Sequence, residues 1–415
     1  MRGWLLMMIL VQSAPADTDV WDLPPLRYSD STATDSVAKL AADLASGVRK
    51  VEGATGLARL RFVLKELRVP EASQVLVFSK TSFQNSLIHP QNPRSLYFSE
   101  EAYVGYVPGG HIEAIIQDPL LGPVFYVIEF AKAGGLKILR DTSSCIDCHG
   151  TSNTEGVPGM QVRSVFSDLD GRPLFAMGTR QVNHETPLAE RWGSYYVTGR
   201  SSLPHLGNRS YVENGPAAPQ PSDLPDLTPI LDVSKYPRPT SDIVALLVLE
   251  HQCRMHNLLN AATVQYRRAA YLTRALDPEA DPDASSAGRV ADGIAEQIVG
   301  CLFFKDEADP GEGIEGGEEF QKVFEARYPR TRDGESLADF QLNNRLFKRR
   351  CSFMIYSSAF RNLPARVKSA VFAKMQAALA GADPAFAELK APERKQIAAI
   401  LAETLPDWPH LRSAE

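Results

Sequence analysis

The chain has 415 residues, of which 44% are hydrophobic and 23% are charged, enough for the ordinary cores of two folded domains. Its formal net charge is −6 and it contains no basic block, so nucleic acid is excluded as an expected partner. Beyond the N-terminal region, the longest apolar run is Ile243 to Leu249, which is too short to span a membrane. We therefore expect no membrane span in the mature protein.

The N-terminus has the three parts of a secretion signal. Arg2 is followed by the apolar run 4–11 and then by Ser13-Ala14-Pro15-Ala16, which ends in an A-x-A cleavage motif. The sequence therefore predicts a signal peptide over residues 1–16, export to a periplasm or further, and a mature chain that begins near Asp17. Residues 17–35 are polar and are predicted to form a loose leader.

Residues 36–213 have the pattern of an α+β domain. Apolar residues at helical spacing predict a first helix along Val37, Leu40, Leu44 and Val48, and a second helix over 57–69. The period then changes to short β-rich runs between turn residues, which predicts a mainly antiparallel sheet, with a PAS-like shape as one expectation. The predicted strands are 75–78, 95–98, 103–107, 112–116 and 124–128, and the chain leaves the sheet through 136–140.

The most specific motif is Cys145-Ile146-Asp147-Cys148-His149, which reads C-x-x-C-H, the attachment signature of a covalent c-type haem. The chemistry sets the spacing. Two thiols add to the vinyl groups on one edge of the porphyrin, and the next residue places an imidazole under the iron. We expect Cys145 and Cys148 to form the thioethers and His149 to be the proximal iron ligand, with one haem c per chain.

Other interpretations of this motif explain it less well. A redox CxxC pair has no use for the adjacent His, and a structural zinc site needs a second pair of ligands, which the sequence lacks. Cys253, Cys301 and Cys351 remain, an odd number for an exported protein. We interpret them as small buried hydrophobes, with one free thiol as the alternative.

After the motif, Asp168-Leu169-Asp170-Gly171 predicts a hairpin between runs 162–166 and 174–177. The region 183–208 is rich in aromatic residues and glycine. Its rings are either covers for the haem or ordinary core residues of a strand, and the sequence favours neither. These rings are Trp192, Tyr195 and Tyr196.

The sixth iron ligand is not fixed by the sequence. His205, in a loop before Leu206-Gly207-Asn208, ranks first, followed by an open site, then His184, then Met160. A second imidazole would lower the reduction potential, whereas a thioether from Met160 or Met177 would raise it. The alternative is a hydrogen-bonding or surface role for each His and core filling for each Met.

Residues 214–240 contain seven prolines and predict an extended, semi-rigid linker. It would separate the haem domain, 36–213, from an all-α domain, 241–415. In the second domain we expect a long central helix that Ser241 caps and that ends near Ala275. Further helices are expected over 287–304, 337–347, 351–360, 364–380 and 392–403, with an acidic, glycine-rich loop over 306–319.

The long helix carries a candidate metal constellation, which comprises Glu250, His251, Cys253 and His256. Cys253 and His256 share a helix face. His251 lies roughly 140° around the helix from His256, so all four side chains cannot bind one ion from this helix alone. We favour core-packing histidines, and a histidine that reaches the haem is a third alternative.

Ten strings also match a known family: 77–82, 103–107, 145–150, 156–159, 191–199, 205–208, 241–246, 249–252, 255–257 and 352–357. Over most of the mature chain, they resemble exported cytochrome c domain-containing proteins of planctomycete-type bacteria, with one C-x-x-C-H motif and a helical C-terminal domain. The resemblance implies a shared architecture and a haem, but no reaction, substrate or sixth ligand. The chain departs from the family pattern at Ser194, Tyr195 and Arg350, where the family has Gly, Trp and Pro.

Three functions fit these observations. We favour a monohaem redox protein that passes single electrons to or from a redox partner protein. A peroxidase-like or other haem enzyme would need an open distal site and an acid–base group near the iron, and the sequence identifies no catalytic residue. A haem-based sensor or binding module would need a partner protein, since no output domain follows.

Overall fold

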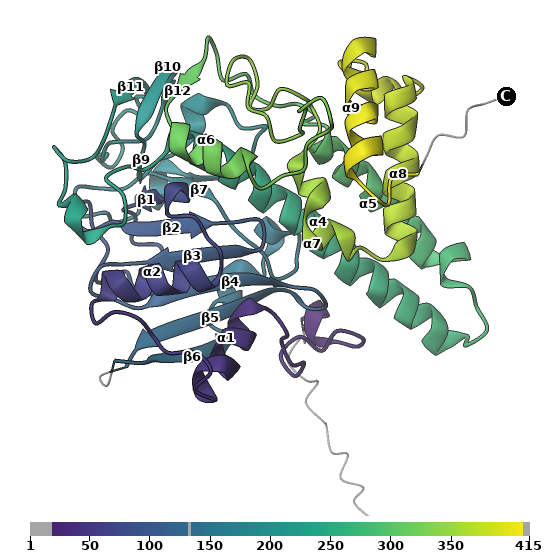
Figure 1. Ribbon diagram of the computed structural model, residues 1–415, viewed down its shortest axis with the longest axis horizontal. Coiled ribbons are helices and arrows are strands. Elements are labelled where there is room, and N and C mark those ends of the chain that lie inside the picture. Colours follow the sequence, from purple (N-terminus) through teal and green to yellow (C-terminus); the bar gives the residue numbers. More distant parts are fainter. Residues whose placement is uncertain (1–18, 132–133, 410–415) are drawn as a thin grey trace, which may run out of the picture.

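A computed structural model describes residues 19–131 and 134–409, so the predicted signal peptide lies outside the described residues. The fold is α+β, with a seven-stranded sheet, flanking helices and a helical C-terminal region (Figure 1). The strand order is β6-β5-β4-β3-β2-β1-β9, and every neighbouring pair is antiparallel. The strands are β1 (Val75–Val77), β2 (Arg94–Phe98), β3 (Ala102–Tyr106), β4 (Ile112–Asp118), β5 (Gly122–Phe130), β6 (Leu136–Asp141) and β9 (Tyr195–Tyr196).

One face of the sheet packs against two N-terminal helices, α1 (Ser36–Ala45) and α2 (Gly56–Glu66). Buried and partly exposed residues alternate along β4, so Ile112, Ala114 and Ile116 point into this core. Both helices and the antiparallel sheet agree with the sequence prediction.

The prediction of a loose leader over 17–35 is wrong where this segment is described. Trp21 and Tyr28 are buried in the same core as α1 and α2. The Tyr28 hydroxyl donates to the Pro123 carbonyl oxygen at 2.7 Å, which fixes the segment to β5. The prediction relies on the polar composition of the segment and overlooks its two large rings. Their burial is favourable enough to order the chain around them.

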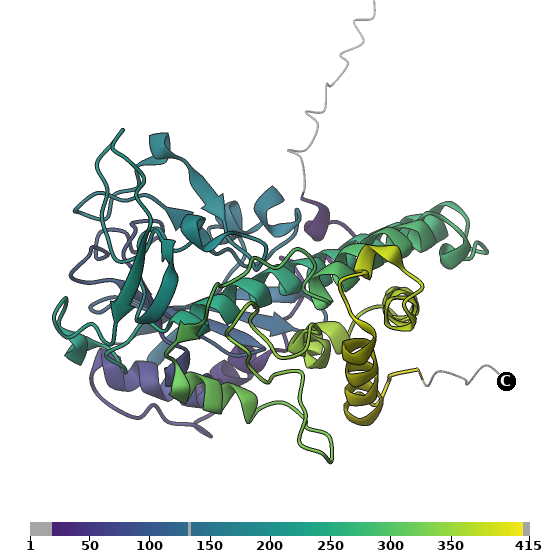
Figure 2. The ribbon, with the colours of Figure 1, turned by 90° about the horizontal axis from the view of Figure 1, so that it is seen from above.

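The opposite face of the sheet is covered by α4 (Ile243–Leu276), a 34-residue helix that continues well past the sheet (Figure 2). Every residue of its first three turns, from Ile243 to Cys253, is buried. These first three turns of α4 share one core with Val75, Val77 and Phe98 of the sheet. The expectation of a long helix that ends near Ala275 is confirmed, and its place in a separate all-α domain stays a prediction.

The sequence prediction places the N-cap of α4 at Ser241, one residue too early. Asp242 is the N-cap, and its carboxylate accepts a hydrogen bond from the Ala245 backbone N–H at 2.7 Å. Ser241 instead joins the helix start to the sheet. Its hydroxyl donates to the Tyr196 carbonyl oxygen at 2.6 Å and accepts from the Leu76 backbone N–H at 2.8 Å.

The Pro-rich segment 214–240 lies against the sheet. Part of it forms β11 (Gln220–Leu224), which pairs with β10 (Gly199–His205), and β10 also pairs with β12 (Ile314–Glu315). Leu227, Leu231 and Tyr236 are buried together with Leu76 and Phe78. The division into two folding units therefore stays a prediction, because strand pairs and shared cores cross the predicted boundary.

The predicted hairpin after the motif forms, but with a shifted second arm. β7 (Arg163–Val165) pairs with β8 (Thr179–Gln181), and Gly171 takes a φ of +81° in the connection. The second arm predicted over 174–177 is instead a 3-10 turn, Phe175–Met177. The Asp168 carboxylate accepts hydrogen bonds from the backbone N–H groups of Asp170 and Arg172. These two bonds close a turn at the start of the connection.

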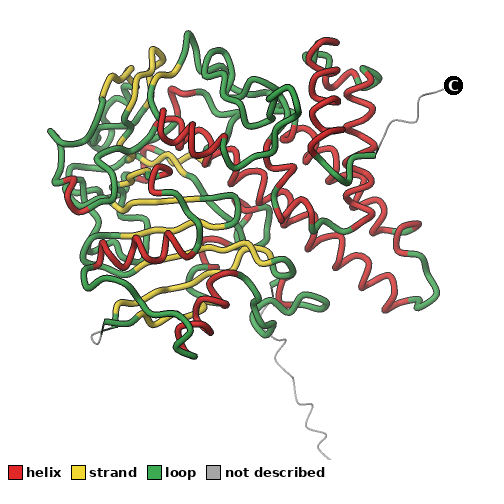
Figure 3. The backbone as a smooth tube through the Cα atoms, in the orientation of Figure 1, coloured by secondary structure: helices red, strands yellow, loops and turns green. Residues whose placement is uncertain are grey.

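The C-terminal region is mainly helix and loop (Figure 3). Gly381, at φ +78°, ends α8 as the sequence predicts. No helix in the described part of the chain is long and apolar enough to cross a membrane. The helices are α5 (Ser286–Leu302), α6 (Glu318–Glu325), α7 (Ser358–Arg361), α8 (Ala365–Ala380) and α9 (Ala391–Thr404).

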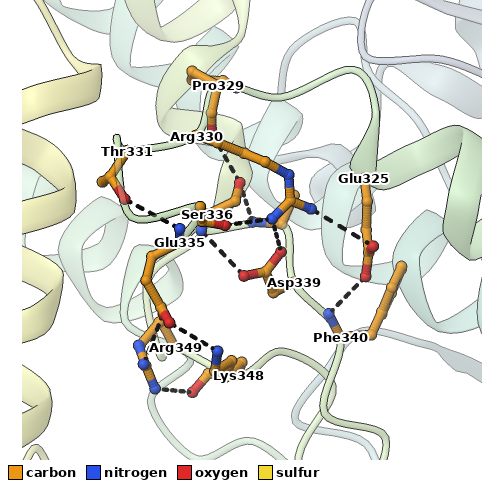
Figure 4. A network of polar contacts seen from close by, with 12 residues as sticks. Glu325, Pro329, Arg330, Thr331, Glu335, Ser336, Asp339, Phe340, Lys348 and Arg349 are labelled. Carbon is orange, nitrogen blue, oxygen red and sulfur yellow. Dashed lines mark hydrogen bonds and ion pairs between the residues drawn. The ribbon is translucent and has the colours of Figure 1, made fainter.

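The helix predicted over 337–347 is instead a loop that a polar network holds (Figure 4). Arg330 Nη1 lies 2.7 Å from Asp339 Oδ1, and Asp339 Oδ2 accepts from the Ser336 backbone N–H. Arg349 Nη2 lies 2.8 Å from Glu335 Oε2. Side chains that bind the backbone compete with helix formation, which explains the error. The helix predicted over 351–360 is likewise a 3-10 turn, Phe353–Tyr356, followed by α7.

Candidate functional site

The C-x-x-C-H motif lies directly after the edge strand β6. The Asp141 carboxylate, at the end of β6, accepts from the backbone N–H groups of Ser143 at 3.1 Å and Cys145 at 2.9 Å. One helical turn follows, α3 (Ile146–His149), with Cys145 at its N-cap. Ile146 is buried in the core below the sheet. The strand end and this buried side chain thus fix the start of the turn.

The two motif thiols are free and reach the surface. Cys145 is partly exposed and Cys148 is exposed, and neither is in a disulfide. Burial, together with the nearby Asp141 carboxylate, raises the pKa of Cys145 to about 12, so this thiol stays protonated at neutral pH. Both sulfur atoms are therefore available to a group outside the polypeptide.

The His149 imidazole is held in one orientation. Its Nδ1 lies 2.9 Å from the Gly159 carbonyl oxygen. Because a carbonyl oxygen only accepts, Nδ1 carries the proton and Nε2 keeps its lone pair. Burial lowers the pKa of His149, which keeps the ring neutral at pH 7. A neutral ring with an oriented, free Nε2 is the form in which histidine binds a metal.

A tight loop supplies that carbonyl group. The Gly159 backbone N–H donates back to the His149 carbonyl oxygen at 2.8 Å. Thr154 Oγ1 lies within hydrogen-bond distance of the carbonyl oxygens of His149 and Val157, at 3.1 and 2.7 Å. The side chain of Asn257, on α4, binds the backbone of the next residue, Met160. Its Oδ1 accepts from the Met160 N–H at 2.9 Å, and its Nδ2 donates to the Met160 carbonyl oxygen at 2.8 Å.

The sheet face beside His149 is partly apolar. The Phe125 ring lies with its centroid 5.4 Å from that of His149. Phe125 pairs with Asp141, and Val127 pairs with Leu139, so all four share one face of β5 and β6. Leu139 is 41% exposed, which leaves an apolar side chain uncovered next to the motif.

An ion pair lies on the same face. Arg94 Nη2 is 3.1 Å from Glu113 Oε2. Burial opposes the charge on Glu113, but Arg94 and hydrogen bonds from Ser82 and Gln84 lower the pKa of this carboxyl below its usual value. Arg94 and Arg163 both act electrostatically on the His149 imidazole.

The predicted distal ligands are engaged elsewhere. His205 is fully buried, with Nε2 2.8 Å from Ser222 Oγ and Nδ1 accepting from the Gly207 backbone N–H. His184 contacts His251, with 3.2 Å between their Nδ1 atoms. Met160 is buried and directly follows Gly159, on the Nδ1 side of His149.

The aromatic region is core. Tyr195 and Tyr196 form β9, and Trp192 Nε1 donates to Glu250 Oε1 at 2.6 Å. Glu250 Oε2 also lies 2.7 Å from Arg191 Nη1, and both side chains of this ion pair are buried.

The four-residue constellation of α4 does not converge on one point. Glu250 faces Arg191 and Trp192, whereas His251 faces His184. His256 Nδ1 lies 2.7 Å from the Tyr103 hydroxyl. A single metal site made by these α4 residues is therefore not formed.

Sequence reasoning missed the residues that orient His149. Gly159 follows a Pro shortly after the motif, and that turn was the available signal. Asp141, four residues before Cys145, was a local signal, whereas Arg94 and Glu113 carried none, because only the sheet brings them near the motif.

No protein-family model, no curated protein and no solved structure matches this chain. The chemical interpretation therefore rests on the motif and on the geometry around it.

Proposed function

We propose that this protein is an exported monohaem c-type cytochrome that carries electrons. The observation that carries the proposal is the hydrogen bond from His149 Nδ1 to the Gly159 carbonyl oxygen, within a C-x-x-C-H turn. It presents a neutral imidazole Nε2 next to two unpaired thiols. Cys145 and Cys148 would hold the porphyrin, and His149 would be the proximal ligand.

The residues present fit a haem in three respects. Each thiol is free to add across one vinyl group, with the new C–S bond at one carbon and the thiol hydrogen at the other. Val127 and Leu139 supply apolar surface beside the motif, over the buried Phe125 ring. Arg163 supplies positive charge near His149, which suits a group that bears carboxylates, whereas the charge of Arg94 is balanced by Glu113.

A bound haem supplies reversible one-electron oxidation and reduction of its iron. The chain's own part is to fix the proximal imidazole and to set its basicity. The Nδ1 hydrogen bond makes the imidazole a stronger donor. Since Cys148 is exposed, the attachment edge lies at the surface, where a redox partner protein would approach.

A haem protein with an open sixth position, either a sensor or an oxidising enzyme, is the second candidate. His205 has both ring nitrogens occupied, and His184 is paired with His251. Met160 is buried, and its backbone N–H and carbonyl group are both hydrogen-bonded to Asn257. These contacts favour an open position over the three predicted ligands. A PAS-like sheet would suit the sensor role, and the signal would then pass to a partner protein.

The proposal is tested by expression of the full chain with a c-type maturation system. The haem should survive denaturing gel electrophoresis and acid–acetone extraction. The Cys145→Ala/Cys148→Ala variant should lose it, whereas Cys253→Ala, at a buried thiol away from the motif, should keep it. Extraction of the colour from wild type would refute covalent attachment, and an N-terminus near Asp17 on the secreted form would support export.

A further inference from the structure

Away from the C-x-x-C-H turn, two imidazoles and one thiol meet inside the molecule. A ring nitrogen of His184, a ring nitrogen of His251 and Sγ of Cys301 all lie within 4.8 Å of one another. The three residues come from the loop after β8, from α4 and from α5. All three are buried. Three separate segments thus direct metal-ligand atoms to one point.

The spacing of these atoms is that of a coordination sphere. The Nδ1 atoms of His184 and His251 are 3.2 Å apart. Two imidazole ligands of one tetrahedral zinc, each at about 2.0–2.1 Å, are about 3.3–3.4 Å apart. Burial lowers the pKa of both rings, that of His184 to about 3, so at pH 7 both are neutral with a lone pair.

Surrounding contacts hold the histidines in place. Ser352 Oγ lies 2.7 Å from His251 Nε2, the kind of outer partner that orients a ligating imidazole. The His251 ring stacks on Phe304 at 4.1 Å between centroids. The loop of His184 is fixed to α4 because Arg191, paired with Glu250, donates to the His184 carbonyl oxygen at 3.1 Å.

We infer that His184, His251 and Cys301 form a buried metal site and that its ion is Cu(I). Two imidazoles and a thiolate are ligands for soft or borderline ions, not for calcium or magnesium. As the metal–sulfur bond forms, the Cys301 thiol releases its proton to solvent. A monovalent ion then leaves the site neutral, whereas a divalent ion would leave a net positive charge beside Phe304 and Phe353. This inference does not depend on the haem.

The test uses the full chain in a Cys145→Ala/Cys148→Ala background, so that the surface thiols cannot bind the metal. Cu(I) is supplied from a chromophoric Cu(I) chelator under anaerobic conditions, and Zn(II) is titrated in parallel. We expect one Cu(I) per chain, held against the chelator. Loss of an outer-shell partner already weakens metal binding about 10- to 100-fold. Cys301→Ser should therefore lower the affinity by more than about 100-fold, and Ser352→Ala by less.

Matched controls separate the site from general effects of buried substitutions. Cys253 and Cys301 are each 5% exposed, and His256 and His251 are both fully buried on α4. Cys253→Ser and His256→Gln should therefore keep full affinity, whereas Cys301→Ser and His251→Gln should lose it. Cu(I) should also raise the Tm of the unaltered site and of both controls.

Three results would overturn the inference. Failure of the folded parent to retain either metal would eliminate the site. Preferential retention of Zn(II) would refute the monovalent ion. Equal Cu(I) affinity in Cys301→Ser and Cys253→Ser would place the metal elsewhere.

Discussion

The His149 imidazole donates through Nδ1 to the carbonyl oxygen of Gly159, ten residues later in the chain, at 2.9 Å. This contact fixes the tautomer and aims Nε2 away from the loop. The hydrogen bond thereby gives the motif histidine a defined ring orientation, which the motif sequence alone does not specify.

The first prediction concerns Gly159. A Cβ there would lie 2.4 Å from Asn257 Oδ1 and 2.8 Å from Thr154 Cβ, so Gly159→Ala must displace the loop. We expect a loss of about 1–3 kcal/mol in the free energy of unfolding, as for other overpacked sites. A weaker hydrogen bond makes His149 a poorer donor, so the reduction potential of the haem form should rise.

The control for that variant is Gly135→Ala, because a Cβ at Gly135 meets nothing within 4 Å. Chemical denaturation and redox titration measure both effects. An unchanged potential in a destabilised Gly159→Ala protein would show that the hydrogen bond does not tune the iron.

The second prediction concerns the sixth ligand. The contacts of His205 to Ser222 and Gly207 predict that His205→Ala leaves the optical and EPR spectra of the haem unchanged. A wild type that is high-spin in the ferric state and binds CO in the ferrous state would favour the sensor or enzyme, whereas a low-spin wild type would favour electron transfer. A low-spin wild type that becomes high-spin in His205→Ala would instead restore His205 as the distal ligand.

The third prediction concerns the buried ion pair. Arg191→Leu leaves the Glu250 carboxylate buried without its cation, which should lower the free energy of unfolding by about 3–5 kcal/mol. Arg200→Leu breaks the exposed pair with Glu315 and should lower it by about 1 kcal/mol or less. Urea unfolding of the two variants measures the difference, and equal losses would contradict the role of burial.

The fourth prediction concerns pH. Burial alone lowers the pKa of His256 to about 3, whereas an unfolded histidine titrates near pH 6.5. Below pH 6.5 the unfolded state takes up a proton that the native state does not, so stability is lost as the pH falls toward 3. The slope is about 1.4 kcal/mol per pH unit for this one group.

His256→Gln removes that contribution. Between pH 7 and pH 5 the variant should lose about 2 kcal/mol less stability than the wild type. Urea titrations at both pH values measure it. Parallel losses in the two proteins would mean that His256 is already charged in the native state.

The fifth prediction concerns the Pro-rich segment. The chain that leads into it from β10 to β11, residues 206–219, contains no helix or strand, and Val212 there is 76% exposed. Limited proteolysis should therefore cut first at residues 212–219, or in the acidic loop 306–319, and the fragments should stay associated through their shared cores. Fragments that separate without denaturant would support two independent folding units.

The sequence alone identified the elements whose signals are local. The strands β1 to β5, the helices α1, α2, α4 and α5, and the end of α8 at residue 380 follow from periodicity and capping residues over a few turns. The C-x-x-C-H motif is local in the same sense, because its chemistry needs three side chains within five residues. These features depend on neighbours along the chain, which a sequence displays directly.

Tertiary structure decided what depends on distant residues. The Gly159 carbonyl reaches His149 because Asn257, on α4, holds the adjacent Met160 backbone. Trp21 and Tyr28 are ordered because a core exists beneath the sheet to receive them. His184, His251 and Cys301 lie on three separate segments, and only the packing of α4 against α5 and the loop brings them together. Such contacts arise from the fold as a whole, so periodicity and spacing carry no record of them.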